Sequence, residues 1–380
     1  MQSGGSSLPI PDAEGRLHYR HRMTSTWAVG IDRADLARTT LVETELSAIQ
    51  PGEARLRVDR VGLSANNVTY AVLGDSFRYW EFFPAAAFGL GSDWGLVPLW
   101  GFAEVAESTV DGVRVGDRVY GYLPPAGFLT IRPARVDGRG FRDGAEHRTS
   151  LPSPYNVYAL TSADSAYEPN REDLLILYRP LFFTSFMLAD YLTDNQCFGA
   201  TTLVISSASS KTAYGTAFLL RGQGPRVIGL TSPGNVAFTE SLGCYDTVLS
   251  YYDVERLDST TATGYVDVAG DDRVRAAVRE HLGANLVHDG SVGLSHQTAG
   301  GSQTLTSGVF FAPIQMRKRA QDWGRDGLDD RFAEAWRRFA PTVEGWVDVT
   351  VGHGPQALQA TWRELVSGRS SPRTGHVIAL

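Results

Sequence analysis

Lysine and cysteine are scarce in this sequence of 380 residues. Only Lys211 and Lys318 are lysines, so arginine supplies the other 33 of the 35 basic residues. Cys197 and Cys244 are the only cysteines, which excludes a disulfide framework and a four-cysteine zinc site. A formal net charge of −7 argues against nucleic acid or an anionic membrane as the main partner, because both need a basic surface.

Long apolar runs are also missing. We find none that approaches the roughly 18–20 residues that a membrane-spanning helix needs. Residues 1–16 are rich in Gly, Ser and Pro and have no apolar signal core, so they predict a loose tail. We therefore expect a soluble cytoplasmic protein, and its length suits two domains of ordinary size.

The first third of the sequence predicts β-structure. Alternating apolar and polar residues predict a strand at 54–62, and shorter strands are expected at 101–106 and 118–122. Residues 132–165 are rich in Gly, Arg, Ser and Pro, and we expect long surface loops there.

Strands and helices alternate after an apolar helix predicted at 174–192. This alternation is typical of an α/β protein with a doubly wound parallel sheet, whose ligands bind beyond the carboxyl ends of the strands. The predicted strands are 202–206, 226–230, 247–251, 265–269 and 285–288, and the helices are 210–221, 236–242 and 272–282. A helix at 328–339, a strand at 345–351, a helix at 355–367 and a strand at 376–380 follow.

The turn between the first of these strands and its helix lies where a dinucleotide-binding fold has its glycine-rich phosphate loop. Ser207, Ser210 and Ala213 stand where glycines are expected, and Ser209 and Thr212 add hydroxyl groups. The three replacements are small, so a phosphate can still approach closely. A helix capped by serine that binds no ligand is the alternative.

Lys211 lies in the same turn, where a lysine is unfavourable against the helix dipole unless an anion compensates it. We favour a phosphate contact over an ordinary lysine exposed to solvent. The second strand ends in Thr231, Ser232 and Asn235, where an NAD-binding site would have an acidic residue. Neutral donors tolerate a 2′-phosphate and favour NADP(H), although Ser-Pro also begins helices that bind no ligand.

Four segments together resemble the medium-chain dehydrogenase/reductase superfamily, in its zinc-free branch of quinone oxidoreductases and enoyl reductases. They are residues 62–74, 113–122, 226–251 and 375–380. The resemblance implies a GroES-like β-rich catalytic domain at 1–163 that resumes at 309–380, a Rossmann domain at 164–308, and a homodimer. It also implies that Tyr251, at the end of the third segment, belongs to the cofactor-binding set.

Zinc-dependent members of the superfamily carry Gly-His-Glu before a strand like the one at 102–106. Pro98, Leu99 and Trp100 stand there in this sequence, and no cysteine precedes Cys197. The eight histidines form no ligand-spaced cluster with cysteine, so we expect no catalytic metal.

Without a metal, hydrogen-bond donors must polarise a substrate carbonyl. The resemblance implies that residues after the strand ending near Gly62 line the nicotinamide pocket, which points to Tyr70, Asn67 and Asn66. A tyrosine can donate to the substrate oxygen and relay a proton, although Tyr70 packed in the core is the alternative. The aromatic run at 79–84 suits either a substrate wall or a buried loop.

A second basic feature is the run of Arg317, Lys318 and Arg319, which follows the predicted cofactor-binding units. These residues either meet the cofactor's phosphates or face water, and the latter is the usual fate of a short charged run.

The sequence therefore predicts an NADP(H)-dependent, zinc-independent oxidoreductase. It would transfer hydride to an activated C=C bond or a carbonyl of a small apolar substrate. Two alternatives stay open because the glycines and the zinc ligands are missing. One is an enzyme of the same fold with non-redox chemistry, such as a cyclisation or an elimination. The other is a binding protein with a vestigial cofactor site.

Overall fold

The computed structural model describes residues 10–11, 17–18, 25–292 and 309–380. The loose tail predicted at 1–16 lies outside these residues, apart from strand β1 (Ile10–Pro11), which pairs with β2 (Leu17–His18).

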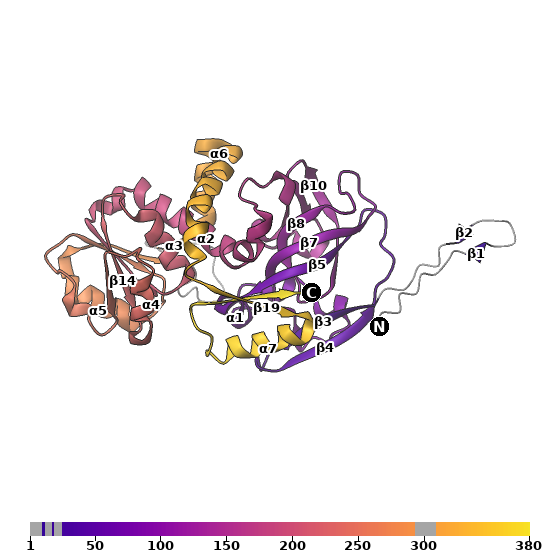
Figure 1. Ribbon diagram of the computed structural model, residues 1–380, viewed down its shortest axis with the longest axis horizontal. Helices are drawn as coiled ribbons and strands as arrows, with labels where there is room; N and C mark the ends of the chain where they lie inside the picture. The colour runs from indigo at the N-terminus through magenta and orange to yellow at the C-terminus, as the bar shows by residue number, and fades with distance from the viewer. Residues whose placement is uncertain (1–9, 12–16, 19–24, 293–308) are drawn as a thin grey trace.

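The first large sheet is mostly antiparallel and has the order β10-β11-β12-β8-β7-β5-β20-β19 within the described residues, with β9 paired to β5. Strands β19 and β20 come from the end of the chain, so two distant parts of the sequence build this sheet (Figure 1). The strands are β5 (Ala54–Leu63), β7 (Leu99–Ser108), β8 (Arg118–Leu123), β9 (Phe128–Ile131), β10 (Pro133–Asp137), β11 (Gly140–Asp143), β12 (Val157–Leu160), β19 (Asp348–His353) and β20 (Thr374–Ala379).

A smaller antiparallel sheet and two helices cover part of this domain. The sequence did not predict β3 or β4, because their apolar residues do not alternate cleanly with polar ones, and α1 is too short, at eight residues, for a helical period to be recognised. Helix α7 packs on β3, and its Trp362 donates a 2.7 Å hydrogen bond to the carbonyl of Leu36. The elements are β3 (Ser25–Asp32), β4 (Thr39–Glu45), β6 (Trp94–Gly95), α1 (Ala65–Val72) and α7 (Gly354–Val366).

Residues 132–165 do not form long surface loops, so that prediction was wrong. They contribute β10, β11 and β12 to the first sheet, and Phe141 and Tyr158 are buried in its core. Gly140 has φ of 139°, and a Cβ there would lie 2.1 Å from the carbonyl oxygen of Tyr158. Glycine is needed here because two strands pair closely, whereas the abundance of glycine in the sequence suggested loops.

The second sheet is parallel throughout and has the order β15-β14-β13-β16-β17-β18. Numbered along the chain from β13, this order is 3-2-1-4-5-6, which is that of a doubly wound dinucleotide-binding fold. The predicted fold class is thereby confirmed, whereas the domain limits at 163/164 and 308/309 stay a prediction. The elements are β13 (Thr202–Ile205), α3 (Lys211–Leu220), β14 (Arg226–Thr231), α4 (Val236–Ser241), β15 (Thr247–Ser250), β16 (Thr263–Asp267), α5 (Asp272–Leu282), β17 (Leu286–Val292) and β18 (Val309–Phe310).

Helices α2 (Glu172–Asp194) and α6 (Ala312–Val343) lie between the two sheets (Figure 1). One hydrophobic core contains most of the buried face of α2 together with Phe102 of β7, Leu203 of β13 and Trp336 of α6. The two sheets therefore share a core through this helix pair. The predicted helix at 174–192 is confirmed with about one more turn in total.

The stretch Pro169–Asp194 is long and apolar enough to cross a membrane by length and composition, so the expectation that no run approaches this length was wrong. Arg179 interrupts the run in the sequence and pairs with Asp164 in the structure. Of the most apolar window, 56% is buried inside the protein, as in the core helix of a globular domain.

Phe182 is expected to contribute more to stability than an exposed aromatic residue does. Its ring stacks on Phe339 of α6 at 4.2 Å between centroids, and its side chain is 1% exposed. Phe182→Ala should lower the free energy of unfolding by roughly 3–5 kcal/mol, because a buried cavity remains.

The control is Phe311→Ala, since Phe311 is 41% exposed and its loss should cost within about 0.5 kcal/mol. Denaturant unfolding followed by circular dichroism checks both variants. Equal losses would contradict the role given to the α2–α6 contact.

Candidate functional site

The first part of the candidate site is the point where β13 and β16 lie side by side at their carboxyl ends. Ser206, directly after β13, donates a 2.9 Å hydrogen bond to Asp267, the last residue of β16. The Ser206 hydroxyl oxygen also accepts hydrogen bonds from the backbone N–H groups of Val268 and Ala269. Strand order reverses between these two strands, and ligands of such sheets bind at that place.

The turn after Ser206 contains no glycine, although one of its residues has a backbone conformation that usually favours glycine. Ser207 has a left-handed φ of 51°, and its backbone N–H donates to the hydroxyl of Tyr251 at 3.0 Å. The hydroxyl of Tyr245 donates to the carbonyl of Ala208 at 2.9 Å. Tyr245 and Tyr251, which flank β15, therefore hold the backbone of the turn against the sheet. Tyr251 is one of the residues predicted to belong to the cofactor-binding set.

The polar residues predicted at the end of β14 come together with this turn. Thr231 and Asn235 both donate to the hydroxyl oxygen of Ser209, at 3.3 and 3.2 Å. Ser232 follows Thr231 and is half-buried. β14 ends in Thr231, and the residues that follow it directly, 232–235, are all neutral.

Helix α3 presents free backbone donors at its start. Ser210 is the N-cap, and its hydroxyl oxygen accepts from the backbone N–H of Ala213 at 3.3 Å. Among the described residues, the backbone N–H groups of Ser209, Lys211 and Thr212 have no hydrogen-bond partner. Three free N–H groups at the N-terminus of a ten-residue helix can bind an anion.

Helix α2 holds this end of α3 in place. Ser185 donates a 2.8 Å hydrogen bond to the carbonyl of Thr212. A Cβ on Gly215 would lie 2.7 Å from the Ser185 hydroxyl oxygen, so glycine at this position allows the two helices to approach closely. The turn before α3 and helix α2 are thus one packed unit.

The side chain of Lys211 lies at the same contact between α2 and α3. Its ammonium lies 5.5 Å from the ring centroid of Tyr178 on α2, and the Tyr178 hydroxyl is 2.7 Å from that of Tyr214. No carboxylate of the described residues forms an ion pair with Lys211. Burial lowers the pKa of Lys211 to about 8.

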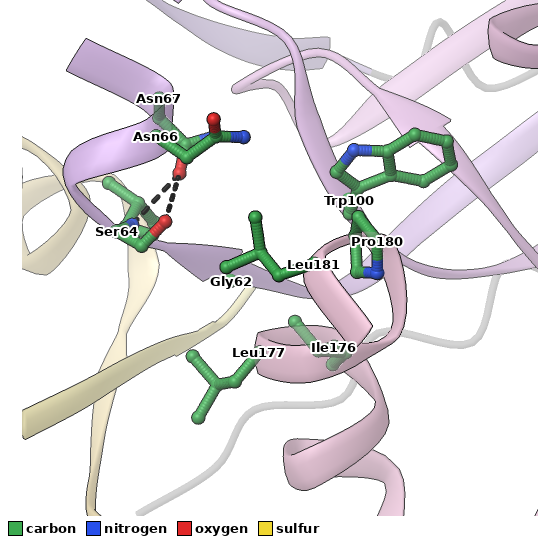
Figure 2. A pocket seen from close by; sticks show the side chains of 10 residues that line it. Gly62, Ser64, Asn66, Asn67, Trp100, Ile176, Leu177, Pro180 and Leu181 are labelled. Carbon is green, nitrogen blue, oxygen red and sulfur yellow. Dashed lines mark hydrogen bonds between the residues drawn. The ribbon is translucent and has the colours of Figure 1, made fainter. Parts of the chain in front are cut away.

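The second part of the site is a small pocket between α1, β7 and α2 (Figure 2). Ser64, Asn66 and Asn67 form one side, and α2 forms another. Its lining residues are Gly62, Leu63, Ser64, Asn66, Asn67, Trp100, Ile176, Leu177, Pro180 and Leu181.

Of the three predicted catalytic residues, Asn66 is half-buried on the pocket wall with its side chain close to Tyr70. Asn67 is 4% exposed and its amide is occupied. It accepts from the backbone N–H of Ser64 at 2.8 Å and donates to the carbonyl of Pro98 at 3.0 Å, which caps helix α1.

Tyr70 lies behind the pocket wall in an aromatic cluster. Its ring centroid is 4.5 Å from that of Tyr79 and 5.9 Å from that of Tyr122. Trp100, which lines the pocket, donates to the Tyr70 hydroxyl at 3.5 Å. Burial raises the pKa of Tyr70, so its hydroxyl stays protonated and can donate a hydrogen bond. Its catalytic role stays a prediction.

Of the three basic residues at 317–319, Arg317 and Lys318 are exposed to solvent, as expected for a short charged run, whereas Arg319 is buried. Lys318 pairs with Asp194, and Arg319 pairs with Asp190 at 2.7 Å and with Asp194 at 2.9 Å. These pairs fasten the start of α6 to the end of α2. Of the two basic features in the sequence, only Lys211 lies near the candidate site.

Sequence reasoning missed Ser206, Asp267, Tyr178 and the pocket-lining role of Trp100. Polar residues directly after buried parallel strands are the signal that could have identified Ser206 and Asp267. Tyr178 and Trp100 carry no such signal, because only tertiary packing brings them to the site. Within the described ranges, no three His, Cys, Asp or Glu side chains form a group that could hold a metal ion.

The fold resembles solved structures at low sequence identity. A putative NADPH:quinone reductase from Mesorhizobium loti is 12% identical, with a TM-score of 0.58 over 94% of this chain and 98% of that one. CurA from Vibrio vulnificus, solved in complex with NADPH, is 14% identical, with a TM-score of 0.56 over 93% and 98%. A thermostable alcohol dehydrogenase from Pyrobaculum aerophilum is 15% identical, with a TM-score of 0.51 over 94% and 100%.

No curated protein matches the sequence significantly. A family model described as "Protein of unknown function (DUF2855)" matches residues 61–371. The chain therefore shares the fold of the medium-chain dehydrogenases/reductases and belongs to the DUF2855 family.

Proposed function

We propose that this protein is an NADP(H)-dependent, zinc-independent oxidoreductase that transfers hydride to an activated C=C bond or a carbonyl of a small apolar substrate. The observation that carries the proposal is the pairing of free N–H groups at the start of α3 with a neutral polar end of β14. The names of similar structures support it, since they include an NADPH:quinone reductase and a complex with NADPH.

The turn fits a dinucleotide in its chemistry. Ser209, Lys211 and Thr212 offer backbone N–H groups that have no partner in the described structure, and a diphosphate accepts hydrogen bonds from such groups. Lys211 adds a positive charge that no carboxylate of the described chain neutralises. Ser207 adopts the left-handed φ of the turn, and Ser210 caps the helix that follows it.

The end of β14 distinguishes between the two nicotinamide cofactors. Ser232 and the Ser209–Thr231–Asn235 group offer hydroxyl and amide donors and carry no negative charge. A carboxylate at this place binds the two ribose hydroxyls of NAD and repels the 2′-phosphate of NADP. Neutral donors favour NADP(H), whose reduced form, NADPH, would supply the hydride.

The pocket beside α1 is the proposed substrate site. Trp100 and the α2 residues Leu177 and Leu181 give it an apolar wall. Asn66 supplies an amide donor for the oxygen of the acceptor, and Tyr70 lies next to it as a neutral hydroxyl. Asn67 acts indirectly, because it caps the helix that carries both residues.

We further propose a small-molecule substrate, a cytoplasmic location and a homodimer, with neither nucleic acid nor a membrane as partner. The net charge of −7 supports the last of these points, because polyanions need a basic surface. Size-exclusion chromatography with light scattering tests the dimer.

Lys211→Ala is expected to weaken NADPH binding by roughly 10- to 100-fold, because a hydrogen bond to a charged group contributes about 1.5–3 kcal/mol. The measurement is a fluorescence titration with NADPH. Lys318→Ala is the matched control, because Lys318 is engaged by Asp194 on α2. If the wild-type protein binds neither NADPH nor NADH, the proposed function is wrong and non-redox chemistry or a binding role is favoured.

Ser232→Asp is expected to shift the preference from NADPH towards NADH, because the new carboxylate repels a 2′-phosphate. The ratio of the two dissociation constants should change by at least tenfold. Ser232→Asn is the control of similar size without charge and should keep the NADPH preference. An unchanged ratio in the aspartate variant would remove the 2′-phosphate from this part of the site.

A further inference from the structure

Trp100 gives the pocket beside α1 its one large wall. Among the residues that line this pocket, Trp100 alone is aromatic. Its indole lies across the pocket from Ser64 and Asn66 and beside Pro180 of α2 (Figure 2). The distance between the indole and the polar side therefore limits the width of any molecule that enters.

The indole is held from behind by buried tyrosines. It is stacked on the ring of Tyr120, with 5.6 Å between centroids and 11° between planes, and its centroid is 4.8 Å from that of Tyr122. Its N–H donates to the hydroxyl of Tyr70 at 3.5 Å. All three tyrosines are buried, and close packing of this kind keeps a side chain in one rotamer. A ligand therefore meets a fixed indole that does not swing aside.

The backbone that carries the indole is fixed as well. Trp100 of β7 is paired in register with Gly62 of β5, which also lines the pocket. A Cβ on Gly62 would lie 2.4 Å from Cγ2 of Ile176, so glycine there lets α2 pack directly on the strand. A Cβ on Gly101, the residue after Trp100, would lie 2.1 Å from the carbonyl oxygen of Arg60. The two glycines thus hold the indole and α2 at a set separation.

The polar side chains decide which end of a substrate meets the indole. None of the residues that line the pocket is charged, so a neutral acceptor fits it better than a carboxylate or a phosphate does. The amide of Asn67 is engaged in capping α1, which leaves that of Asn66 to donate to a carbonyl oxygen. The carbon skeleton of the acceptor then extends away from Asn66, towards Trp100.

We propose that Trp100 is the specificity-determining residue of this site and limits the acceptor to neutral molecules with a single ring or a short chain. The inference rests on the proposed function and narrows its substrate class. The indole is itself a fused two-ring group, so its removal creates the space that a second ring of a substrate needs. The indole, and not the chemistry of the carbonyl group, excludes fused two-ring acceptors.

The test compares matched acceptors that differ by one fused ring. They are 1,4-benzoquinone with 1,4-naphthoquinone, and 2-cyclohexen-1-one with the fused two-ring enone octalone. NADPH oxidation at saturating NADPH gives kcat/KM for each acceptor in the wild type and in Trp100→Ala. We expect the ratio of the two-ring to the single-ring value to rise by roughly 10- to 100-fold in the variant, because the second ring no longer clashes with a packed side chain. The intrinsic reactivities of the two acceptors cancel in this change of ratio.

Two further variants separate the wall from general loosening of the aromatic cluster. Phe82→Ala removes a buried ring that lies 5.2 Å from that of Tyr122 but does not line the pocket, and it should leave the ratio unchanged. Trp100→Leu opens less space and should raise the ratio by less than Trp100→Ala does. The ratio does not depend on how much of a preparation is folded, because both acceptors are measured with the same sample. If Trp100→Ala does not fold, the ratio in Trp100→Leu decides.

The outcomes are distinguishable. NADPH binding and turnover of single-ring acceptors by the wild type, with a ratio that the Trp100 variants leave unchanged or that Phe82→Ala raises equally, overturns the inference and leaves the proposed function intact. Absence of NADPH binding, or of NADPH oxidation with every one of these acceptors, in the wild type overturns the proposed function and with it the inference.

Discussion

The packing of helix α2 between the two sheets is the constraint on which the rest of the structure depends. Its apolar residues belong to a core shared with β7, β13 and α6. Glu172 and Asp173 in its first turn pair with Arg118 and Arg60 of the first sheet, both at 2.6 Å. Acidic residues at a helix N-terminus also interact favourably with the helix dipole. One helix therefore sets the separation between the pocket, which it lines, and the start of α3, which Ser185 contacts.

The turn before α3 shows how a dinucleotide fold can manage without its glycines. Of the three replaced positions, only Ser207 adopts a left-handed φ, which costs a non-glycine residue about 1–2 kcal/mol. Tyr251 and Tyr245 hold that backbone with their hydroxyls. Ser210 needs no glycine because it serves as the helix cap, and Ala213 is small enough to be fully buried.

One physical cause shifts the pKa values of the ionisable groups around the candidate site in two directions. Burial disfavours the charged form of any group, so it raises the pKa of Tyr70 and Tyr178 and lowers that of Lys211. The tyrosines therefore stay neutral hydroxyls, whereas burial disfavours the charged ammonium form of the lysine.

The sequence by itself determined the parallel sheet, its helices and the position of the turn at Ser207–Ala213, because strand–helix alternation and small residues at a helix start are local patterns. It also indicated the neutral end of β14 at Thr231 and Ser232, since that property depends on residue type alone. It did not predict β10–β12, where glycines permit strand pairing, and it left the role of Tyr70 open.

Only the tertiary structure decided which of the candidate groups meet. Both lysines stand out equally in the sequence, yet Lys211 faces the ring of Tyr178 on α2, whereas Lys318 pairs with Asp194 at the end of that helix. Asn66 and Asn67 are neighbours, yet one lies on the pocket wall with its amide near Tyr70 and the other is occupied by the cap of α1. The reason is physical: the burial and partners of a side chain depend on elements that are distant along the chain, and those determine its charge state and its availability for chemistry.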